Sequence, residues 1–471
     1  MNAAPERSPA AGSAFSAIEA VKEIVGGTGK KYYIQTFGCQ QNEADSERVA
    51  GMCEEMGYSR SGSPEEADLI VVNTCAVREH AEKRALSVIG QYKHLKKGPC
   101  SPVIAVCGCM VSQGHRADQL KKSYPYVDFS FGTSDLQSFP ELLLGRLSGG
   151  PRRFAMPPER PLIAEGIPVR RESSFRAWLS IMYGCDNFCS YCIVPYVRGR
   201  ERSRDVEAVI EESRGLIATG CRDITLLGQN VNSYGRGLPY EISFSDLLER
   251  IDAIDGDYLI RFMTSHPKDA TKRIADVMAA SRHIAHQYHL PAQSGSDAVL
   301  EAMNRGYTSE AYIAKADYIR EKMPDVALTT DIMVGFPGET DKDFEDTLRL
   351  LEKVRFDGVY SFIYSPRKGT PAAEDPDQVP EKVKSERMEA LLALQTDICA
   401  EKNASLVGKK MRVLVYGESA QDPRFVECRT EGGKLMHIPA DSGVRPGEFV
   451  FANVVSAGAF RLSGEIAGGK G

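Results

Sequence analysis

The chain has 471 residues, a length that predicts two to four domains. Hydrophobic residues make up 42%, enough for more than one core, and the net charge of −6 excludes a uniformly basic nucleic-acid surface but allows local basic patches. No apolar run approaches the roughly 18 residues of a membrane span, and the N-terminal residues lack the pattern of a signal peptide. We therefore expect a cytoplasmic chain, in which twelve cysteines favour metal binding over disulfides.

The N-terminal part of the chain predicts a tail followed by an α/β domain. Residues 1–29, rich in Ala and Ser, predict a flexible tail. In residues 30–150, strands alternate with helices, which predicts a parallel sheet. The strands are expected at residues 31–37, 67–72 and 102–106, and the helices at residues 43–58 and 78–92.

Cys39, Cys75 and Cys109 each stand just past one of these predicted strands. If the strands are parallel, the three thiols lie along one edge of the sheet and can converge on one iron–sulfur cluster. Cys107 competes with Cys109, because the two would share a face if the strand continued. Cys53 lies on an apolar helix face and is expected to be a packed core thiol. The cysteines without partner spacing are interpreted in the same way, namely Cys100, Cys221, Cys399 and Cys428.

The rest of the chain predicts a linker and two further domains. Residues 151–172 are dominated by proline and charge and predict a linker. Residues 173–402 contain six strand-then-helix units, too few for a closed eight-fold barrel, and predict an open partial barrel. Residues 403–468 carry short strand-like runs with Gly and Pro turns, which predict a small all-β barrel. The central strands are expected at residues 177–182, 223–227, 258–263, 286–290, 327–333 and 358–364.

Cys185, Cys189 and Cys192 form a Cys-x-x-x-Cys-x-x-Cys motif directly after the first strand of the central domain. Three thiolates on one short loop can hold three irons of a [4Fe–4S] cube and leave the fourth iron open. An open iron can bind the amino and carboxylate groups of S-adenosylmethionine, and an electron passed into the sulfonium releases a 5′-deoxyadenosyl radical. A structural zinc site is the alternative, but its cysteines usually come as close Cys-x-x-Cys pairs that a longer loop separates from each other. The spacing therefore predicts a radical-generating cluster.

Two further groups of residues follow strands of the central domain, where open α/β sheets and barrels bind their ligands. One group resembles the position at which radical enzymes of this class bind the methionine amino group, and the other loosely resembles their Gly-x-Ile-x-Gly-x-x-x-Glu element. Ordinary strand-to-helix punctuation is the alternative for both. The expected S-adenosylmethionine contacts are Gly228, Gln229, Asn230, Asp331, Gly335 and Glu339.

A basic run follows the radical motif, in the sequence RGRERSR. Alternate residues of an extended segment point to one side, so these arginines could face RNA phosphates. A solvated charged turn is the alternative, since Glu201 interrupts the run. The expected RNA contacts are Arg198, Arg200, Arg202 and Arg204.

With both cysteine sets, the chain resembles the methylthiotransferase family of radical S-adenosylmethionine enzymes, over nearly everything from residue 31 to residue 468. The resemblance rests on long segments in the same order, namely FGCQQNEADSE, NTCAVREHAEKR, GCMVSQ, YGCDNFCSYCIVPYVRGRE, LLGQNVNSYG, HLPAQSGSDAVLEAMNRGYT and DIMVGFPGET. It implies an α/β multidomain fold: an N-terminal methylthiotransferase domain, a partial (β/α)6 radical core and a C-terminal TRAM barrel. It also implies two [4Fe–4S] clusters, with Cys109 rather than Cys107 joining Cys39 and Cys75 on the auxiliary cluster.

The segments around Cys39 and Cys75 resemble the branch of this family that acts on isopentenylated adenosine. The implied reaction places a methylthio group at C2 of N6-isopentenyladenosine at position 37 of tRNA. The implied partners are the tRNA anticodon stem-loop, a reductant such as flavodoxin or ferredoxin and a sulfur donor, with a monomeric chain and no membrane. The alternatives are methylthiolation of threonylcarbamoyladenosine or of a ribosomal protein aspartate, and, from another class, a zinc-stabilised RNA-binding protein without catalysis.

Overall fold

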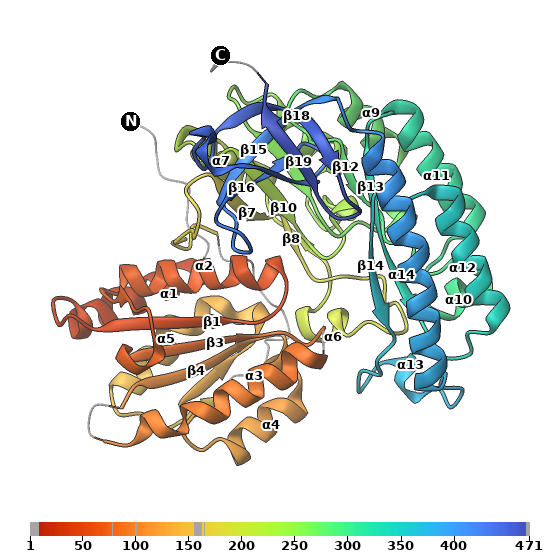
Figure 1. Cartoon of the computed structure of the whole chain (residues 1–471). Coiled ribbons are helices and arrows are strands. Elements are labelled where there is room, and N and C mark those ends of the chain that lie inside the picture. Colours follow the sequence, from red (N-terminus) through yellow and green to blue (C-terminus); the bar gives the residue numbers. More distant parts are fainter. Residues whose placement is uncertain (1–8, 78, 99–100, 155–162, 164, 468–471) are drawn as a thin grey trace. The chain divides into compact units, whose positions relative to one another are not determined.

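The computed structural model describes residues 9–77, 79–98, 101–154, 163 and 165–467. The chain divides into two compact units (Figure 1). The first unit comprises residues 1–172, 182–186 and 192–204, and the second comprises residues 173–181, 187–191 and 205–471. Among the described helices, none combines the length and the apolar character that crossing a membrane requires.

The first unit is built on a parallel sheet with strand order β2-β1-β3-β4-β5-β6. This confirms the parallel sheet predicted for residues 30–150. The last strand, β6, lies at the start of the predicted linker, so part of residues 151–172 belongs to the sheet. The strands are β1 (Lys31–Thr36), β2 (Ser59–Arg60), β3 (Leu69–Thr74), β4 (Val103–Gly108), β5 (Phe129–Phe131) and β6 (Arg153–Phe154).

Helices cover both faces of this sheet because its central strands are apolar on both sides. In β3, Leu69 and Val71 point into one core and Ile70 and Val72 into the other. The first core holds residues of α1 (Pro9–Val25), α2 (Gln40–Glu55) and α5 (Phe139–Leu147). The second holds residues of α3 (Glu79–Gln91) and α4 (Gly114–Ser123). A short antiparallel pair, β8 (Met182–Tyr183) with β9 (Arg202–Ser203), and the helix α6 (Val194–Arg198) complete the unit.

The helix α1 (Pro9–Val25) corrects the prediction of a flexible tail for most of residues 1–29, of which residues 1–8 lie outside the described residues. Ala14, Ile18, Val21 and Val25 recur at helical spacing and are all buried. The last three join the core formed by α2 and α5. The prediction is wrong for α1 because this apolar face was taken as part of an Ala-rich tail.

The second unit contains the six parallel strands predicted for the central domain. They form two three-stranded sheets, ordered β11-β10-β7 and β12-β13-β14. An isolated parallel bridge pairs Ile260 of β11 with Ile284, which precedes β12. The prediction of an open, partial barrel of six strands is thereby confirmed. The strands are β7 (Arg176–Ser180), β10 (Asp223–Leu227), β11 (Leu259–Phe262), β12 (Gln287–His289), β13 (Ala327–Val334) and β14 (Gly358–Ile363).

Helices alternate with these strands, and several begin at clear sequence signals. Thr340 and Asp343 form a capping box at the start of α12, and Ser243 and Asp246 form one at the start of α8. The long α14 lies against β14. The helices are α7 (Val206–Ala218), α8 (Phe244–Asp252), α9 (Lys272–Ala280), α10 (Asp297–Ala302), α11 (Ser309–Lys322), α12 (Asp341–Val354), α13 (Pro371–Glu374) and α14 (Glu381–Ala404).

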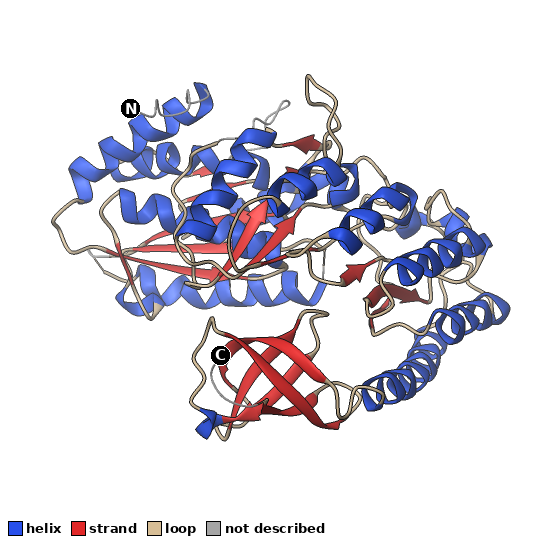
Figure 2. Ribbon diagram, turned by 90° about the horizontal axis from the view of Figure 1, so that it is seen from above, coloured by secondary structure: helices blue, strands red, loops and turns tan. Residues whose placement is uncertain are grey.

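The C-terminal part of the second unit is a closed barrel with strand order β15-β16-β17-β19-β18, drawn as red strands beside the C-terminus in Figure 2. The barrel confirms the small all-β barrel predicted for the C-terminal part of the chain, while its limits at residues 403–468 stay a prediction. Its core includes Val413, Cys428, Met436 and Leu462. The strands are β15 (Lys410–Glu418), β16 (Phe425–Thr430), β17 (Leu435–Pro439), β18 (Phe449–Ala457) and β19 (Leu462–Ile466).

Arg261 of β11 joins this barrel to the β/α strands. Its guanidinium donates to the backbone oxygens of Thr430 and Glu431, at 3.1 and 2.6 Å, and contacts the carboxylate of Asp223 at 3.3 Å. The Tyr416 hydroxyl of β15 donates to the same carboxylate at 2.6 Å. Both members of the Arg261–Asp223 pair are buried, so the pair depends on the barrel to exclude water.

Candidate iron–sulfur cluster sites

The three cysteines of the first unit lie at one edge of its sheet. Cys39 is the N-cap of α2 after β1, Cys75 directly follows β3 and Cys109 directly follows β4. These strands are parallel neighbours, so their carboxyl ends meet at the same edge. A Cβ atom on Gly38 would lie 3.0 Å from Cβ of Cys75, which shows how closely the β1–α2 turn approaches the end of β3. The three thiols therefore lie at the same edge of the sheet, and their binding of one cluster stays a prediction.

Gly108 separates the environments of Cys107 and Cys109. Its φ of +100° ends β4, and a Cβ atom there would lie 2.2 Å from the Thr74 oxygen. The strand therefore does not continue, and the Cys109 N–H donates to that oxygen at 2.9 Å. Cys107 instead packs in the first hydrophobic core, where burial raises the pKa of its thiol. Of the two rivals, Cys109 is the one at the sheet edge.

Two buried asparagines fix the turn that carries Cys39. The Asn42 amide donates to Oδ1 of Asn73 and to the Thr74 oxygen, both at 3.0 Å. The Asn73 amide donates back to the Asn42 oxygen at 2.8 Å and to Oγ of Ser46 at 2.9 Å. This network ties the start of α2 to β3, so the small polar residues beside Cys39 and Cys75 hold the ligand turns in place.

A buried ion pair lies beside these cysteines. Arg198 contacts Asp45 at 3.1 Å, and the side chains are only 5% and 4% exposed. Burial raises the pKa of the Cys109 thiol to about 12, while the charge of Arg198 lowers it. Three thiols with a neighbouring guanidinium form a donor set that suits an iron–sulfur cluster, because the cation favours thiolates.

Cys185, Cys189 and Cys192 lie on one loop after β7. The loop contributes Cys185 and Cys192 to the first unit and Cys189 to the second. Cys185 and Cys189 are buried, and Cys192 is partly exposed. Gly184, with a φ of +79°, lets the loop approach the Arg200 backbone, where a Cβ atom would lie 2.1 Å from the oxygen.

Among the described residues, no three His, Cys, Asp or Glu side chains converge on a single metal ion. A [4Fe–4S] cube does not require this, because each thiolate binds a different iron. Both cysteine sets therefore suit a cluster better than a structural zinc ion, which needs four ligands at about 2.0–2.3 Å.

Arg305 is a residue near Cys189 that the sequence did not single out. Its guanidinium contacts Sγ of Cys189 at 3.4 Å and donates to the Pro291 oxygen at 2.8 Å. The loop is fixed here by Ser190, which donates to Met303 and Ala302 oxygens at 3.1 and 2.7 Å. Arg305 lies in a polar stretch, NRGY, in which nothing signals burial.

The first expected S-adenosylmethionine contacts lie directly after β10, as predicted. Gly228, Gln229 and Asn230 follow the last strand residue, Leu227. The amide nitrogen of Asn230 donates to Asp269 at 2.7 Å, and its Oδ1 has no hydrogen-bond partner among the described residues. Contact of these residues with S-adenosylmethionine stays a prediction.

The second group is arranged differently from the expectation. Asp331 lies within β13, opposite Tyr360 of β14, rather than past the strand end. Gly335 follows β13, and its N–H donates to Oε2 of Glu339 at 2.7 Å. Glu339 is 1% exposed and forms a 2.8 Å ion pair with Arg387 of α14. Glu339 thus holds the turn against α14, and a direct contact of these residues with S-adenosylmethionine stays a prediction.

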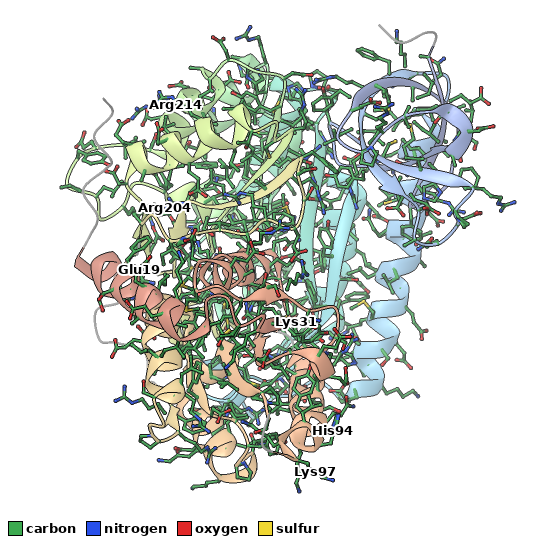
Figure 3. The ribbon with its side chains drawn as sticks, turned by 90° about the vertical axis from the view of Figure 1, so that its left-hand side faces the viewer. Glu19, Lys31, His94, Lys97, Arg204 and Arg214 are labelled. Atoms are coloured by element: carbon green, nitrogen blue, oxygen red, sulfur yellow. The ribbon has the colours of Figure 1, made fainter. Side chains whose placement is uncertain are left out.

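The basic run is not the extended, outward-facing segment that was predicted. Arg198 ends α6 and is buried with Asp45, and Arg204, labelled in Figure 3, is 5% exposed and pairs with Glu165 at 2.6 Å. The RNA-contact prediction is wrong for these two, because a buried ion pair cannot face phosphates without being broken. Arg202 is half-buried and donates to the Arg198 oxygen at 3.1 Å. Arg200 is 72% exposed and pairs with Asp186, so its contact with RNA stays a prediction.

Comparisons with known proteins agree with this arrangement. Residues 179–351 match the Radical SAM superfamily, and residues 31–132 match the family described as "Uncharacterized protein family UPF0004". The chain is 46% identical, over 95% of its length and 95% of the relative's, to "tRNA-2-methylthio-N(6)-dimethylallyladenosine synthase" of Alkaliphilus oremlandii. It is 47% identical to the protein of the same name from Carboxydothermus hydrogenoformans, over 93% of this chain and 99% of the relative.

A solved structure shares the fold. The radical S-adenosylmethionine methyltransferase TsrM from Kitasatospora setae, with tryptophan and a SAM analogue bound, aligns with a TM-score of 0.54 at 15% identity, over 73% of this chain and 75% of that one. This likeness concerns the fold alone. The identity to the relatives, sustained over nearly the whole chain, decides the family. The chain belongs to the radical S-adenosylmethionine methylthiotransferases, in the family of the tRNA-2-methylthio-N(6)-dimethylallyladenosine synthases.

Proposed function

We propose that this chain converts N6-isopentenyladenosine at position 37 of tRNA into its 2-methylthio derivative. The observation that carries the proposal is the identity of 46% over 95% of the chain to a relative with that named activity. The C2–H bond of the base is unactivated, and acid–base chemistry at neutral pH cannot remove its hydrogen usefully. A primary carbon radical can remove it, and such a radical requires the kind of cluster that three cysteines can hold.

Each cysteine set has its own task in this proposal. Cys185, Cys189 and Cys192 would hold the cluster that binds S-adenosylmethionine, and Cys39, Cys75 and Cys109 would hold the auxiliary cluster. When bound, the first cluster supplies the electron that makes the 5′-deoxyadenosyl radical, and the second supplies an open iron for sulfur. Two cysteines of each set are buried, namely Cys75 and Cys109 in one and Cys185 and Cys189 in the other, which supports this use. Gly228, Gln229 and Asn230 would position S-adenosylmethionine at the end of β10.

The partners and the domain limits belong to the same proposal. The substrate is tRNA, and the electron would come from a carrier such as flavodoxin or ferredoxin, with a separate sulfur donor, in a cytoplasmic monomer. The methylthiotransferase domain would span residues 30–150, the radical core residues 173–402 and the TRAM domain residues 403–468. The closed barrel has the size of an oligonucleotide-binding fold and would contact the RNA stem-loop.

Nucleoside mass spectrometry tests the substrate. The chain is expressed in a bacterial strain that lacks its own enzyme of this kind and accumulates N6-isopentenyladenosine. We expect 2-methylthio-N6-isopentenyladenosine in the tRNA digest of the complemented strain and its absence with the empty vector. Methylthiolated threonylcarbamoyladenosine, or a methylthiolated ribosomal protein with unchanged tRNA, would instead favour one of the alternative substrates.

Replacement of Cys185, Cys189 and Cys192 by Ala tests the radical cluster. Anaerobically reconstituted wild-type chain should carry about eight irons, and the variant about four, because one of two cubes loses its ligands. The variant should form no 5′-deoxyadenosine from S-adenosylmethionine. Cys428→Ala, inside the barrel core, is the matched control and should keep both clusters. Persistent 5′-deoxyadenosine in the triple variant, or zinc in place of iron in the wild type, would contradict the assignment.

A further inference from the structure

Arg305 is a buried cation with an unusual set of neighbours. The residue is 4% exposed, and the contacts that its guanidinium makes with described residues are to neutral oxygens and one sulfur. It donates from Nε to the Tyr307 hydroxyl at 3.0 Å and lies 3.4 Å from the Tyr191 hydroxyl. Its guanidinium carbon also lies 5.3 Å from the centre of the Tyr307 ring. Within the part of the chain that is described, no carboxylate lies within ion-pair distance of it.

A buried charge without a counter-charge is expensive for a folded protein. The other buried arginines among the described residues follow this rule: Arg198 pairs with Asp45, Arg204 with Glu165, Arg261 with Asp223 and Arg387 with Glu339. Burial alone would lower the pKa of the Arg305 guanidinium, and Tyr191, Tyr307 and Cys189 are the groups that raise it. A cysteine binds metal as a thiolate, so ligation of a cluster by Cys189 would place an anion at the sulfur that this guanidinium contacts.

We propose that Arg305 is a positioning residue for the cluster on Cys185, Cys189 and Cys192, where it serves as the counter-charge and hydrogen-bond donor that raises the cluster's reduction potential. The inference rests on the proposed cluster ligation. Three thiolates and a [4Fe–4S]²⁺ core sum to a charge of −1, and one electron from an external one-electron carrier makes it −2 without moving a proton. A fixed cation favours the more negative state, and a hydrogen bond to the ligand sulfur acts in the same direction.

The surroundings of Arg305 fix its position. The Pro291 oxygen and the Tyr307 hydroxyl each accept a hydrogen bond from the guanidinium. The Tyr307 hydroxyl in turn donates to the Ala292 oxygen at 2.7 Å. The guanidinium is therefore held from the side away from Cys189. Because it cannot turn toward solvent, its charge stays at the cluster in both oxidation states.

The test measures the reduction potential of this cluster alone. In the full-length parent chain, Cys39, Cys75 and Cys109 are replaced by Ala, so that one cluster remains. The potential is followed by EPR during a dithionite titration without S-adenosylmethionine. Arg305→Met should lower the potential so that the reduced fraction falls at least tenfold at a fixed solution potential, which is about 59 mV for one electron. Arg305→Lys, which keeps the charge, should lose less, and Tyr307→Phe should give a smaller decrease.

Arg261→Met is the matched control, since it removes a buried arginine of the same unit that is paired with a carboxylate. Its potential should equal that of the parent. An unchanged potential in Arg305→Met, or an equal decrease in Arg261→Met, would overturn the inference and leave the proposed function intact. A parent that holds no [4Fe–4S] cluster would overturn the ligand assignment and the inference together. If Arg305→Met loses its iron, the reduction potential of Tyr307→Phe is the deciding measurement. A potential equal to that of the parent in Tyr307→Phe would then overturn the inference.

Discussion

At the scale of single residues, position relative to a turn decides what a cysteine does. Cys107 and Cys109 are two residues apart in the same short segment and both are buried. Cys107 lies in the core that α1, α2 and α5 share with the sheet, whereas Cys109 lies past the strand end in a smaller cluster with Ala76, Ile193 and Val197. Gly108 causes the difference, because its positive φ ends the strand before the alternation of side chains reaches Cys109.

This difference predicts opposite outcomes for two neighbouring substitutions. Cys109→Ala should remove the auxiliary cluster and leave about four irons per chain, the content of one cube. Cys107→Ala should keep about eight irons but lower the free energy of unfolding by about 1 kcal/mol, since it removes one buried core atom. Iron analysis with a denaturation curve distinguishes the two. Loss of iron in Cys107→Ala with full iron in Cys109→Ala would reverse our assignment.

His266 makes stability depend on pH. Burial, with Arg305 and Lys268 nearby, lowers the pKa of His266 to about 2. The unfolded chain binds a proton near pH 6.5 while the folded chain does not, so stability falls as pH drops below about 6.5. His266→Asn keeps an acceptor for the Lys268 N–H and removes the titration. Between about pH 7.5 and 5.5, the wild type should lose about 1.4 kcal/mol more stability than the variant. Equal losses in a denaturant titration would contradict this prediction.

The sequence predicted the two cysteine sets but not the charges beside them. Spacing after strands is enough to place Cys39 and Cys75 at one edge, because parallel strands end there. The choice of Cys109 over Cys107 came from the family resemblance, not from spacing. Burial of Arg198 could not be predicted in this way, since an arginine in RGRER looks solvent-exposed and its partner Asp45 is distant in sequence. Arg305 was missed for the same reason. Tertiary ion pairs leave no periodic signal in the chain.

At the scale of elements, strands and helices with a clear period were predicted well. All six parallel strands of the second unit were found, because most of them are short apolar runs between turn signals. The exceptions are short or atypical, such as β19, which was missed, and α1, whose apolar face was taken for a tail. An Ala-rich helix gives a weak hydrophobic contrast, so packing rather than composition reveals it.

The contribution of α1 can be measured at adjacent positions. Ile18→Ala should destabilise the first unit by about 2–4 kcal/mol, because the side chain is fully packed in the core beneath α1. Glu19→Ala is the neighbouring control, exposed and labelled in Figure 3, and should change stability by less than about 0.5 kcal/mol. Hydrogen exchange of the β3 amides reports on this unit. A similar effect of both substitutions would mean that α1 does not pack as described.

At the scale of the whole molecule, buried polar contacts help to join the barrel to the rest of the second unit. Arg261 reaches two backbone oxygens of the barrel and is neutralised by Asp223, which also accepts a hydrogen bond from Tyr416. Such an arrangement stabilises the fold only when all its members are present, because removal of one member leaves a buried charge without a partner.

Arg261→Met should therefore loosen the barrel. We expect a penalty of about 3 kcal/mol, the lower end for a broken buried pair. Amide exchange at the β16–β17 turn around Glu431 should become faster by a factor on the order of 100. Arg424→Met, on the same barrel but 81% exposed with its partner Asp422, should leave exchange unchanged. Unchanged exchange in Arg261→Met would show that apolar packing alone holds the barrel.

The three cysteines of the first unit follow strands that are far apart in the sequence, so they leave the ribosome at different times. Cys39 and Cys109 are 70 residues apart, so at roughly 5–20 residues per second the ribosome releases the third thiol about 4–14 s after the first. Arg198, which neutralises Asp45 beside these thiols, emerges a further 89 residues later. The nascent chain thus presents Cys39 and Cys75 before β4 and Cys109 exist, and Asp45 gains its buried partner only after all three thiols have been made.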